Sequence, residues 1–391
     1  MRVRWNGALT SPPIPRRIKA GVRPAAFGLP EDERSLPIGF AMWMMRAFSR
    51  VRPQAASHSS RADVQSRRVD ALRSMAAWAR QRTLLLGARL VLFVAHPLLI
   101  AYFFAKLRYV PDPAFPKRYN ELFLWRKLID RNPLFVTLSD KLAAKAFARA
   151  RCPDLPIVET LWSGTDPAGI PASLLVGDVM VKASHGSGFN LAVTGGAPSR
   201  AEIIKAAAGW MRRPYGIRHG EWACQAVPPQ ILVEDKLRLG GGDLPTDLKL
   251  HAFDGAIAHC WAVDRIGGRS LTYDANANPI ATRDSYCPRH DQVLPDTAML
   301  RLLVREAVVL AARMSRGLDH VRVDLMIADG RLVFGELTVY PCAGYDMWDN
   351  PSISQNLART WDIRKSWFLT TPRRGLMRLY AEALRAVLDA R

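Results

Sequence analysis

The segment from His320 to Tyr340 constrains the fold more than any other part of the chain. Apolar and polar residues alternate on both sides of Asp329-Gly330, the pattern of two antiparallel strands joined by a tight turn. A two-residue turn would put Glu336 on the same face as Val323 and mix charge with core. A three-residue turn, Ala328-Asp329-Gly330, shifts the pairing by one residue and separates the two faces. We therefore predict a hairpin with a three-residue turn.

In this register one face of the hairpin is apolar and the other is polar. The apolar face is predicted to carry Val321, Val323, Leu325, Ile327, Val333, Leu337 and Val339, and the polar face Arg322, Asp324, Glu336 and Thr338. Adjacent carboxylates repel each other unless a cation lies between them, and Mg²⁺ prefers one or two carboxylates together with waters and phosphate oxygens. The polar face is a candidate magnesium site. The alternative is a salt bridge of Arg322 with Asp324 or Glu336 on an exposed sheet.

The segment Val179–Asn190 is a short apolar run that leads into a glycine-rich polar loop. Alternation along a strand points Lys182 away from the core. Gly186 and Gly188 allow the backbone to approach an anionic ligand, and Ser184 and Ser187 add hydroxyl donors. We predict a strand and loop that hold phosphate, without the residue order of a Walker A loop. An ordinary strand followed by a flexible turn is the alternative.

Three further segments carry polar residues in regular positions. The apolar strand Ile231–Leu237 becomes charged at its end and is predicted to offer its backbone to a flat base. Lys141 and Lys145 lie on one face of a helix that we expect Ser139 to cap, although such a pair is commonly a solvated surface. Asp247, Lys249 and His251 share one face of a strand that turns back at Asp254-Gly255.

The charge of the chain is concentrated near its N-terminus. Of the net +20, residues 1–60 carry +7 (ten Lys/Arg, three Asp/Glu) and residues 61–110 carry +7 (nine against two), which leaves +6 for the other 281 residues. Prolines and Ser/Ala stretches favour a disordered basic extension over residues 1–80. Such an extension suits an anionic membrane surface, or it is a solvated tail. We expect no nucleic-acid partner, because no basic face is interleaved with aromatic residues.

Residues 81–110 form an apolar helical segment, in which Leu84–Ala105 is interrupted by Arg89, His96 and Pro97. Its uninterrupted part is about 16 residues long, short of the roughly 20 that span hydrocarbon. Three interpretations stay open: a marginal transmembrane helix, an interfacial anchor, and a packed helix hairpin broken at Pro97.

The five cysteines are scattered without paired spacing, which indicates reduced thiols and neither a disulfide framework nor a zinc site. With no apolar signal segment in the first 40 residues, we expect a cytoplasmic protein, a candidate for association with the inner face of the cytoplasmic membrane.

The order of these segments resembles the ATP-grasp superfamily, and more closely the TupA-like ATP-grasp family. The matching segments are Lys117–Asp130, Asp140–Lys145, Lys182–Asn190, Glu221-Trp222, Ile231–Leu237, Asp247–Gly255 and Arg322–Tyr345. The resemblance implies an α+β fold in which two α/β subdomains clamp ATP between antiparallel sheets, preceded by a helical or disordered basic extension. The catalytic domain is then expected over residues 111–391.

The resemblance also implies a role for each candidate residue. Lys145 and Lys182 would reach the phosphates of ATP, under a loop formed by Ser184, His185, Gly186, Ser187 and Gly188. Glu234 would hold the adenine through its side chain, and Asp235, Lys236 and Leu237 through their backbone. Mg²⁺ would bind Asp324, Glu336 and Thr338, although Asn is common in the superfamily where Thr338 stands. Arg322 would lean over the transferred phosphoryl group, with Lys249 as a second catalytic candidate.

The implied reaction uses ATP to phosphorylate a carboxylate and lets an amine displace the phosphate, giving an amide. Lys145, Lys182, Arg322 and Mg²⁺ would neutralise the charge of phosphoryl transfer, and His185 or His251 would shuttle a proton. The family's association with surface polymers implies work on cell-surface polysaccharide or glycopeptide, with a small-molecule or lipid-linked saccharide carboxylate and an amine donor as partners. The alternatives are another phosphotransferase such as a sugar kinase, and a non-catalytic nucleotide-binding protein at the membrane.

Overall fold

The structure, a computed structural model, describes residues 61–237, 246–264, 268–282 and 292–390. The chain divides into two compact units, residues 1–71 and 72–391, and the described part of the first is helical. The predicted extension up to residue 60 lies outside the described residues. Residues 61–80, which we expected to be disordered, belong to the helix α2 (Arg61–Ala95). The reason is composition: from residue 61 to 86 the chain lacks Gly and Pro and is rich in Ala, Arg and Leu, which favour helix.

The apolar segment after residue 81 is the end of α2 followed by a second helix, α3 (Pro97–Leu107). The two meet at 95°. The break falls at Pro97, as predicted, because proline lacks the N–H that would continue α2 and suits the first turn of the next helix. Among the described helices, none by itself has the length and hydropathy needed to cross a membrane, whereas this bent pair together meets both criteria.

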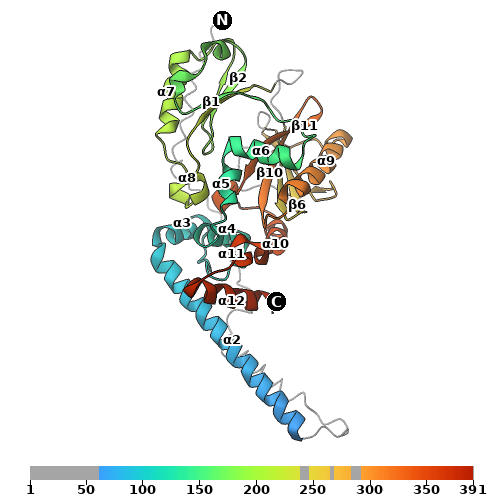
Figure 1. Ribbon diagram of the computed structural model, residues 1–391. Coiled ribbons are helices and arrows are strands. Elements are labelled where there is room, and N and C mark those ends of the chain that lie inside the picture. The colour runs from blue at the N-terminus through green and yellow to red at the C-terminus, as the bar shows by residue number, and fades with distance from the viewer. Residues whose placement is uncertain (1–60, 238–245, 265–267, 283–291, 391) are drawn as a thin grey trace, which may run out of the picture. The chain divides into compact units, whose positions relative to one another are not determined.

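A four-stranded antiparallel sheet follows the N-terminal helices. Its strands are β1 (Thr160–Gly164), β2 (Val179–Ala183), β3 (Asn190–Val193) and β4 (Ile231–Asp235), in the order β1-β4-β2-β3. The helix α7 (Arg200–Met211), capped by Ser199, packs on β2 (Figure 1). Val179, Val181 and Ile203 are buried between them, which leaves the other face of the sheet polar.

A second, larger sheet has the strand order β11-β10-β5-β6-β7-β8, with β9 paired with β7. The strands are β5 (Thr246–Phe253), β6 (Ala256–Asp264), β7 (Arg269–Tyr273), β8 (Pro279–Ile280), β9 (Gln292–Val293), β10 (Val321–Ala328) and β11 (Arg331–Thr338). The helix α9 (Ala298–Ser315) packs on β5, β6 and β10 (Figure 1).

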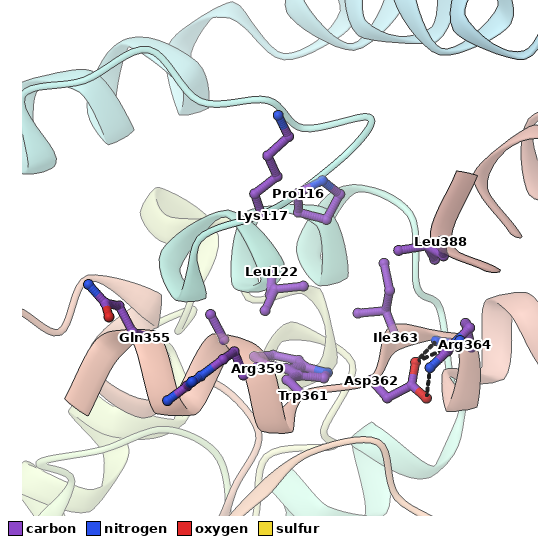
Figure 2. A pocket seen from close by; sticks show the side chains of 11 residues that line it. Pro116, Lys117, Leu122, Gln355, Arg359, Trp361, Asp362, Ile363, Arg364 and Leu388 are labelled. Carbon is purple, nitrogen blue, oxygen red and sulfur yellow. Dashed lines mark hydrogen bonds and ion pairs between the residues drawn. The ribbon is translucent and has the colours of Figure 1, made fainter. Parts of the chain in front are cut away.

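The remaining helices surround the two sheets. They are α4 (Tyr119–Leu128), α5 (Leu134–Ser139), α6 (Lys141–Arg151), α8 (Trp222–Gln225), α10 (Pro351–Thr360), α11 (Trp367–Thr370) and α12 (Gly375–Asp389), with short 3-10 turns η2 (Pro167–Gly169), η3 (Ala172–Val176), η4 (Ile217–His219), η5 (Pro341–Gly344) and η6 (Ile363–Lys365). Asp140, and not Ser139, caps α6 through its carboxylate. A cavity of about 550 Å³ lies between residues of α4, α10, η6 and α12 (Figure 2).

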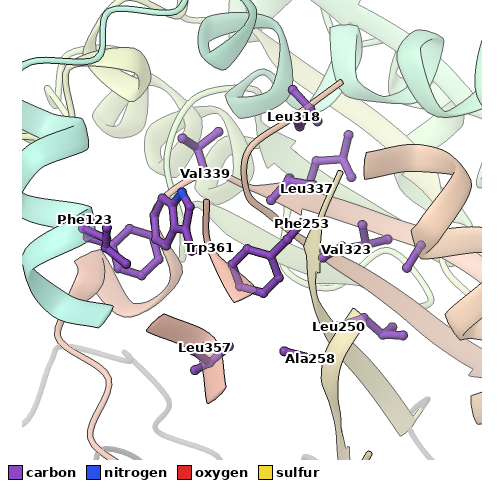
Figure 3. Packing of buried hydrophobic residues seen from close by; sticks show 14 of the residues in the cluster. Phe123, Leu250, Phe253, Ala258, Leu318, Val323, Leu337, Val339, Leu357 and Trp361 are labelled. Carbon is purple, nitrogen blue, oxygen red and sulfur yellow. The ribbon is translucent and has the colours of Figure 1, made fainter. Parts of the chain in front are cut away.

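The larger sheet and the helices share one hydrophobic core. Figure 3 shows Phe253 of the sheet beside Trp361 and Phe123, with Leu250, Val323 and Leu337 in the same cluster of buried residues. Within this core Arg126 of α4 is completely buried and donates to Asp319 at 2.8 Å, while the Trp361 indole donates to the other Asp319 oxygen. A buried pair of this kind is costly to break, because the remaining charge would have no partner. It therefore fixes α4 against the start of β10.

Candidate active site

The hairpin of β10 and β11 has the polar face that the sequence predicts, but a different turn. Ala328 pairs with Arg331, so the turn has two residues, Asp329 and Gly330, both with positive φ. The predicted three-residue turn is wrong. Near the turn Leu332 and Phe334 pair with Ile327 and Leu325, so Val333, which pairs with Met326, is not on the predicted face.

The extra residue lies farther along, at a β-bulge. The register shifts between Asp324 and Leu325, so that Asp324 pairs with Glu336 and Leu325 with Phe334, leaving Gly335 between them. A methyl group at Gly335 would lie 2.8 Å from the backbone oxygen of Asp324. Glycine at this position thus allows the two carboxyl-bearing residues to stand side by side.

The carboxylate of Asp324 is held by two cations. The Nε and Nη2 atoms of Arg322 donate to its oxygens at 2.6 Å each, and Lys249 Nζ donates at 2.9 Å. Burial by itself raises the pKa of Asp324, but Arg322 and Lys249 outweigh this effect and hold that pKa below its usual value. The salt bridge of Arg322 with Asp324, considered as the alternative to a metal site, is therefore present.

Glu336 is placed differently, although it pairs with Asp324. Its side chain is 45% exposed, compared with 6% for Asp324. The Thr338 hydroxyl donates to Glu336 at 3.3 Å and accepts from Arg322 at 3.2 Å. The three predicted metal ligands are thus brought together, with Glu336 as the accessible one.

Asp324 and Glu336 fit a magnesium ion that also binds oxygen atoms of a nucleotide or of water. Among the described residues no group of three His, Cys, Asp or Glu side chains could hold a metal. Mg²⁺ usually takes one or two carboxylates and completes its shell with phosphate oxygens and water. The exposed carboxylate of Glu336, with Asp324 beside it, matches that smaller donor set.

On the four-stranded sheet, the two predicted lysines meet at one carboxylate. Glu234 contacts Lys145 Nζ and Lys182 Nζ, both at 2.5 Å. Lys145 also donates to the Val158 carbonyl and the Thr160 hydroxyl at 2.8 Å each, whereas the Lys182 side chain is 28% exposed. Lys182 is thus the more accessible of the two cations, and Glu234, predicted to hold adenine, here neutralises both lysines.

The residues after Glu234 continue the backbone pairing past the end of β4. Asp235 is exposed, and the Lys236 backbone N–H donates to the Asp178 carbonyl at 3.1 Å. Lys236 Nζ contacts the Thr194 hydroxyl. Leu237 is the last residue of this segment that the structure describes.

The glycine loop divides into a buried base and an exposed tip. The Ser184 hydroxyl is buried and engaged by Pro228 and Gln230, and His185 is buried against Phe189. Ser187 and Gly188 are exposed. Of the predicted loop ligands, Ser187 and the backbone around Gly186 and Gly188 face outward, whereas the Ser184 side chain bonds within the protein.

Lys141 is a site residue that its sequence spacing could not distinguish from a surface lysine. Its Nζ donates to the Gly186 carbonyl of the glycine loop. A cavity of about 80 Å³ lies beside this contact and is lined by Lys141, Gly186, Ser187, Tyr215, Glu221, Cys224 and residues of β11 from Glu336 onward. Burial and the nearby Lys182 ammonium lower the pKa of Lys141, while Glu336 opposes them. Lys141 therefore contacts the glycine loop and also lines the cavity beside β11.

Glu221 and Lys127 form a second buried charged group at this cavity. Glu221 is 4% exposed, and burial raises the pKa of Glu221 to about 7 against the opposing charge of Lys127. Lys127 donates to the Ala343 carbonyl at 2.6 Å, and burial lowers its pKa to about 8. A carboxyl group that titrates near neutral pH in a cavity is suited to proton transfer.

His185 and His251, the two histidines considered as proton shuttles, are buried and contact other residues of the protein. His251 Nδ1 lies 3.0 Å from the Tyr119 hydroxyl and 3.2 Å from His320 Nε2, in a completely buried cluster. Burial lowers the pKa of both His251 and His185. Both rings are better placed to hold structure than to accept a proton from a substrate.

The cavity of Figure 2 does not gather its charges toward one point. Lys117, Arg359 and Arg364 contribute cations to its lining, but their side chains extend in different directions, and Arg364 is paired with Asp362. The smaller cavity at Lys141 is lined by residues of the predicted glycine loop and by the predicted metal ligands Glu336 and Thr338. It is the candidate active site.

Replacing Lys141 with Gln is expected to loosen the glycine loop. The variant loses a charged donor to the Gly186 carbonyl, a contact worth about 1.5–3 kcal/mol, so backbone amides of residues 185–189 should exchange hydrogen faster. Hydrogen exchange followed by mass spectrometry checks this. Arg149→Gln, an exposed change on the same helix, is the control. Unchanged exchange in the loop would show that Lys141 does not restrain it.

A family model described as TupA-like ATPgrasp matches residues 121–359. The chain therefore belongs to the TupA-like ATP-grasp family. A search of curated proteins by sequence finds no match.

Similar solved structures are ATP-grasp ligases. The D-alanine–D-alanine ligase from Helicobacter pylori has 14% identity over 63% of this chain and 70% of that chain, with a TM-score of 0.37. The corresponding enzyme from Bacillus anthracis, complexed with ATP, has 14% identity over 57% and 64%, with a TM-score of 0.33. The ligase PsnB with its minimal precursor has 14% identity over 53% of this chain and 54% of that chain, with a TM-score of 0.29.

Proposed function

We propose that this protein is an ATP-dependent carboxylate–amine ligase. The observation that carries the proposal is the cavity between the glycine loop and β11, which has Lys141 on one side and Glu336 on the other. Lys182 of β2 and Lys145 of α6 both contact Glu234 of the four-stranded sheet. Three ammonium groups near two carboxylates suit a nucleotide polyphosphate and its divalent ion.

The residues take the following roles in the proposal. Lys182 and Lys145 bind phosphate oxygens, and the exposed tip of the glycine loop covers them. Glu336 and Asp324 hold Mg²⁺, with Thr338 orienting Glu336; the ion supplies charge neutralisation for phosphoryl transfer. Arg322, held in place by Asp324, faces the same side of the sheet and stabilises negative charge on the acyl group.

The reaction has two steps. A carboxylate oxygen of the acceptor attacks the γ-phosphorus of ATP, which gives an acyl phosphate and ADP. An amine then attacks the acyl carbon, the C–O bond to phosphate breaks, and an amide, phosphate and one proton result. We assign the proton to Glu221, whose pKa near 7 allows it to accept a proton at neutral pH. The substrate class we favour is a saccharide carboxylate, free or lipid-linked, with a small amine.

A direct test of the proposal is nucleotide binding followed by product detection. Calorimetry of the full chain with Mg-ATP should show binding, which Lys182→Ala weakens about 10- to 100-fold by removing a charge-assisted contact. Lys205→Ala, an exposed change on α7, should bind as the wild type does. A screen of carboxylate and amine pairs for ADP release then identifies the acceptor. Absence of ATP binding would overturn the proposal, and binding without release for any pair would favour a non-catalytic protein.

The role of Glu221 predicts a specific pH dependence. Its carboxylate form increases as the pH rises through about 7, so the wild-type rate should rise over that interval. Glu221→Gln should be about 10²-fold slower above pH 8 and close to the wild type at low pH. The ratio of the two rates at each pH cancels the titration of the amine substrate. A ratio that does not change with pH would exclude Glu221 as the base.

A further inference from the structure

The helix pair α2–α3 is apolar on two sides, and the protein covers one of them. On the inner side Leu85 and Leu92 join the main core, while Ile100 and Phe103 pack with Leu124 and Tyr345. The sequence of α3, Pro-Leu-Leu-Ile-Ala-Tyr-Phe-Phe-Ala-Lys-Leu, is apolar apart from Tyr102 and Lys106. Apolar helix surface of this extent is normally buried.

The outer side is a continuous exposed apolar surface. The exposed fraction is 57% for Leu86, 62% for Leu90, 82% for Val94, 85% for Leu98 and 47% for Phe104. Beside them is a groove of about 400 Å³ whose lining is entirely apolar: Phe93, Pro97, Ile100, Ala101, Phe104, Val110 and Pro111. We call these exposed residues and the groove the outer face. Contiguous apolar surface of this kind marks a docking site.

The charged residues that the outer face's own part of the chain contributes are all basic. Residues 71–111 contain no Asp or Glu, and their basic residues are Arg73, Arg80, Arg82, Arg89, Lys106 and Arg108. Arg80 and Arg82 precede the apolar stretch and are exposed, as are Lys106 and Arg108 after it. Arg89 lies 3.9 Å from Asp112. A partner that binds the outer face must therefore accept apolar side chains, and it must carry negative charge near the basic residues on both sides of the apolar stretch.

We propose that the outer face docks on the surface of a bilayer that contains anionic lipids. Apolar side chains enter the acyl boundary while arginines and lysines stay at the headgroups, as in interfacial helices. The 95° bend favours lying in the interface over crossing it, because neither helix alone is long and apolar enough. Anionic headgroups match the basic flanks, each basic residue adding to the attraction.

If the outer face docks on a membrane, packed aromatic rings connect the docked helix α3 to the segment that follows β11 of the candidate active site. On the inner side of α3, the rings of Tyr102 and Phe103 pack on Tyr345 with centroids 5.3 and 6.1 Å apart. Tyr345 follows η5 directly, and η5 follows β11 closely. The proposal concerns a surface separate from the candidate active site and does not depend on the proposed function.

The test is flotation of the full chain with vesicles of two compositions. Vesicles of neutral phosphatidylcholine and vesicles that also contain anionic phosphatidylglycerol are compared, at low and high salt. Wild type should float with the anionic vesicles, less so at high salt. The double variant Val94→Glu/Leu98→Glu should lose at least about 10-fold in binding. Leu376→Glu, at an apolar residue that is equally exposed at 83%, is the control and should bind as the wild type does.

Each other outcome overturns the proposal. Undiminished binding of the double variant would assign attachment to another part of the chain, and equal binding to neutral vesicles would remove the electrostatic part. If wild type forms a dimer in light scattering that the double variant loses, without vesicle binding, the outer face is a contact between two copies. Thermal melting and ATP binding of all variants without vesicles show whether folding and the active site are intact, so failure here is distinct from failure of the proposed ligase.

Discussion

Replacing Glu336 with Gln is expected to lower the rate of ADP release by about 10²- to 10³-fold, the usual cost of removing one group that stabilises transition-state charge. The folded protein should be unaffected, because the Glu336 side chain is 45% exposed and its partners Thr338 and the more distant Arg322 keep other bonds. Steady-state kinetics and the melting temperature measure the two effects separately. Affinity for ATP should fall much less than the rate.

The neighbouring carboxylate provides a sharp comparison. Asp324→Asn removes the carboxylate that holds Arg322 and Lys249, so that among the described residues Arg322 keeps only the Glu336 carboxylate at 3.8 Å and Lys249 only that of Asp247 at 3.6 Å. Breaking a buried ion pair typically costs about 3–5 kcal/mol, so stability should fall by up to that amount together with activity. Glu382→Gln, at an exposed residue of α12, controls for charge alone. If Glu336→Gln retained the wild-type rate, Glu336 would not hold the metal, and the proposed metal site would be wrong.

Replacing Gly335 with Ala is expected to disturb the site without touching any charged residue. The added methyl group would lie 2.8 Å from the backbone oxygen of Asp324, so the bulge must shift and carry Asp324 and Glu336 out of register. We expect a loss of about 1–3 kcal/mol in stability, as for other overpacked positions, and a fall of at least about 10-fold in turnover, because small misplacements of reacting groups are costly. Denaturant unfolding and the rate of ADP release measure these two quantities.

Gly177→Ala is the matched control, since no atom lies within 4 Å of its added methyl group and its φ of −92° suits alanine. It should leave stability and turnover unchanged. A Gly335→Ala protein with wild-type turnover would mean that the paired position of Asp324 and Glu336 does not matter for the reaction.

The sequence was sufficient for the polar face of the hairpin because alternation fixes whether the offset between two strands is even or odd, and so which residues share a face. The predicted turn Ala328-Asp329-Gly330 would pair Asp324 with Phe334, whereas the two-residue turn with the bulge at Gly335 pairs Asp324 with Glu336. These two registers differ by two residues, so the residues beyond the bulge lie on the same faces in both. Only the residues near the turn, such as Val333, lie on different faces. Side-chain pattern alone does not locate a bulge.

The residues that the sequence did not reveal are those whose role depends on tertiary contact. Lys141 and Lys145 are one helical turn apart, and periodicity places both on one face without saying which element covers it. The structure brings Gly186 to the first and Glu234 to the second. Glu221 is one residue before a short helix, and its raised pKa comes from burial, which local sequence does not encode. Alternation did place Lys182 correctly, because Val179, Val181 and Ala183 form the buried side of β2.

The bridge of Glu234 between Lys145 and Lys182 has a consequence for how a polyanion would enter. The two ammonium groups already share a counter-ion supplied by the protein, so arrival of a phosphate is an exchange of one anion for another. Lys145, with two acceptors besides Glu234, can keep its place during that exchange, while the more exposed Lys182 changes partner. The resting pocket thereby avoids the repulsion of two adjacent bare cations, and a nucleotide has to displace a carboxylate to be held.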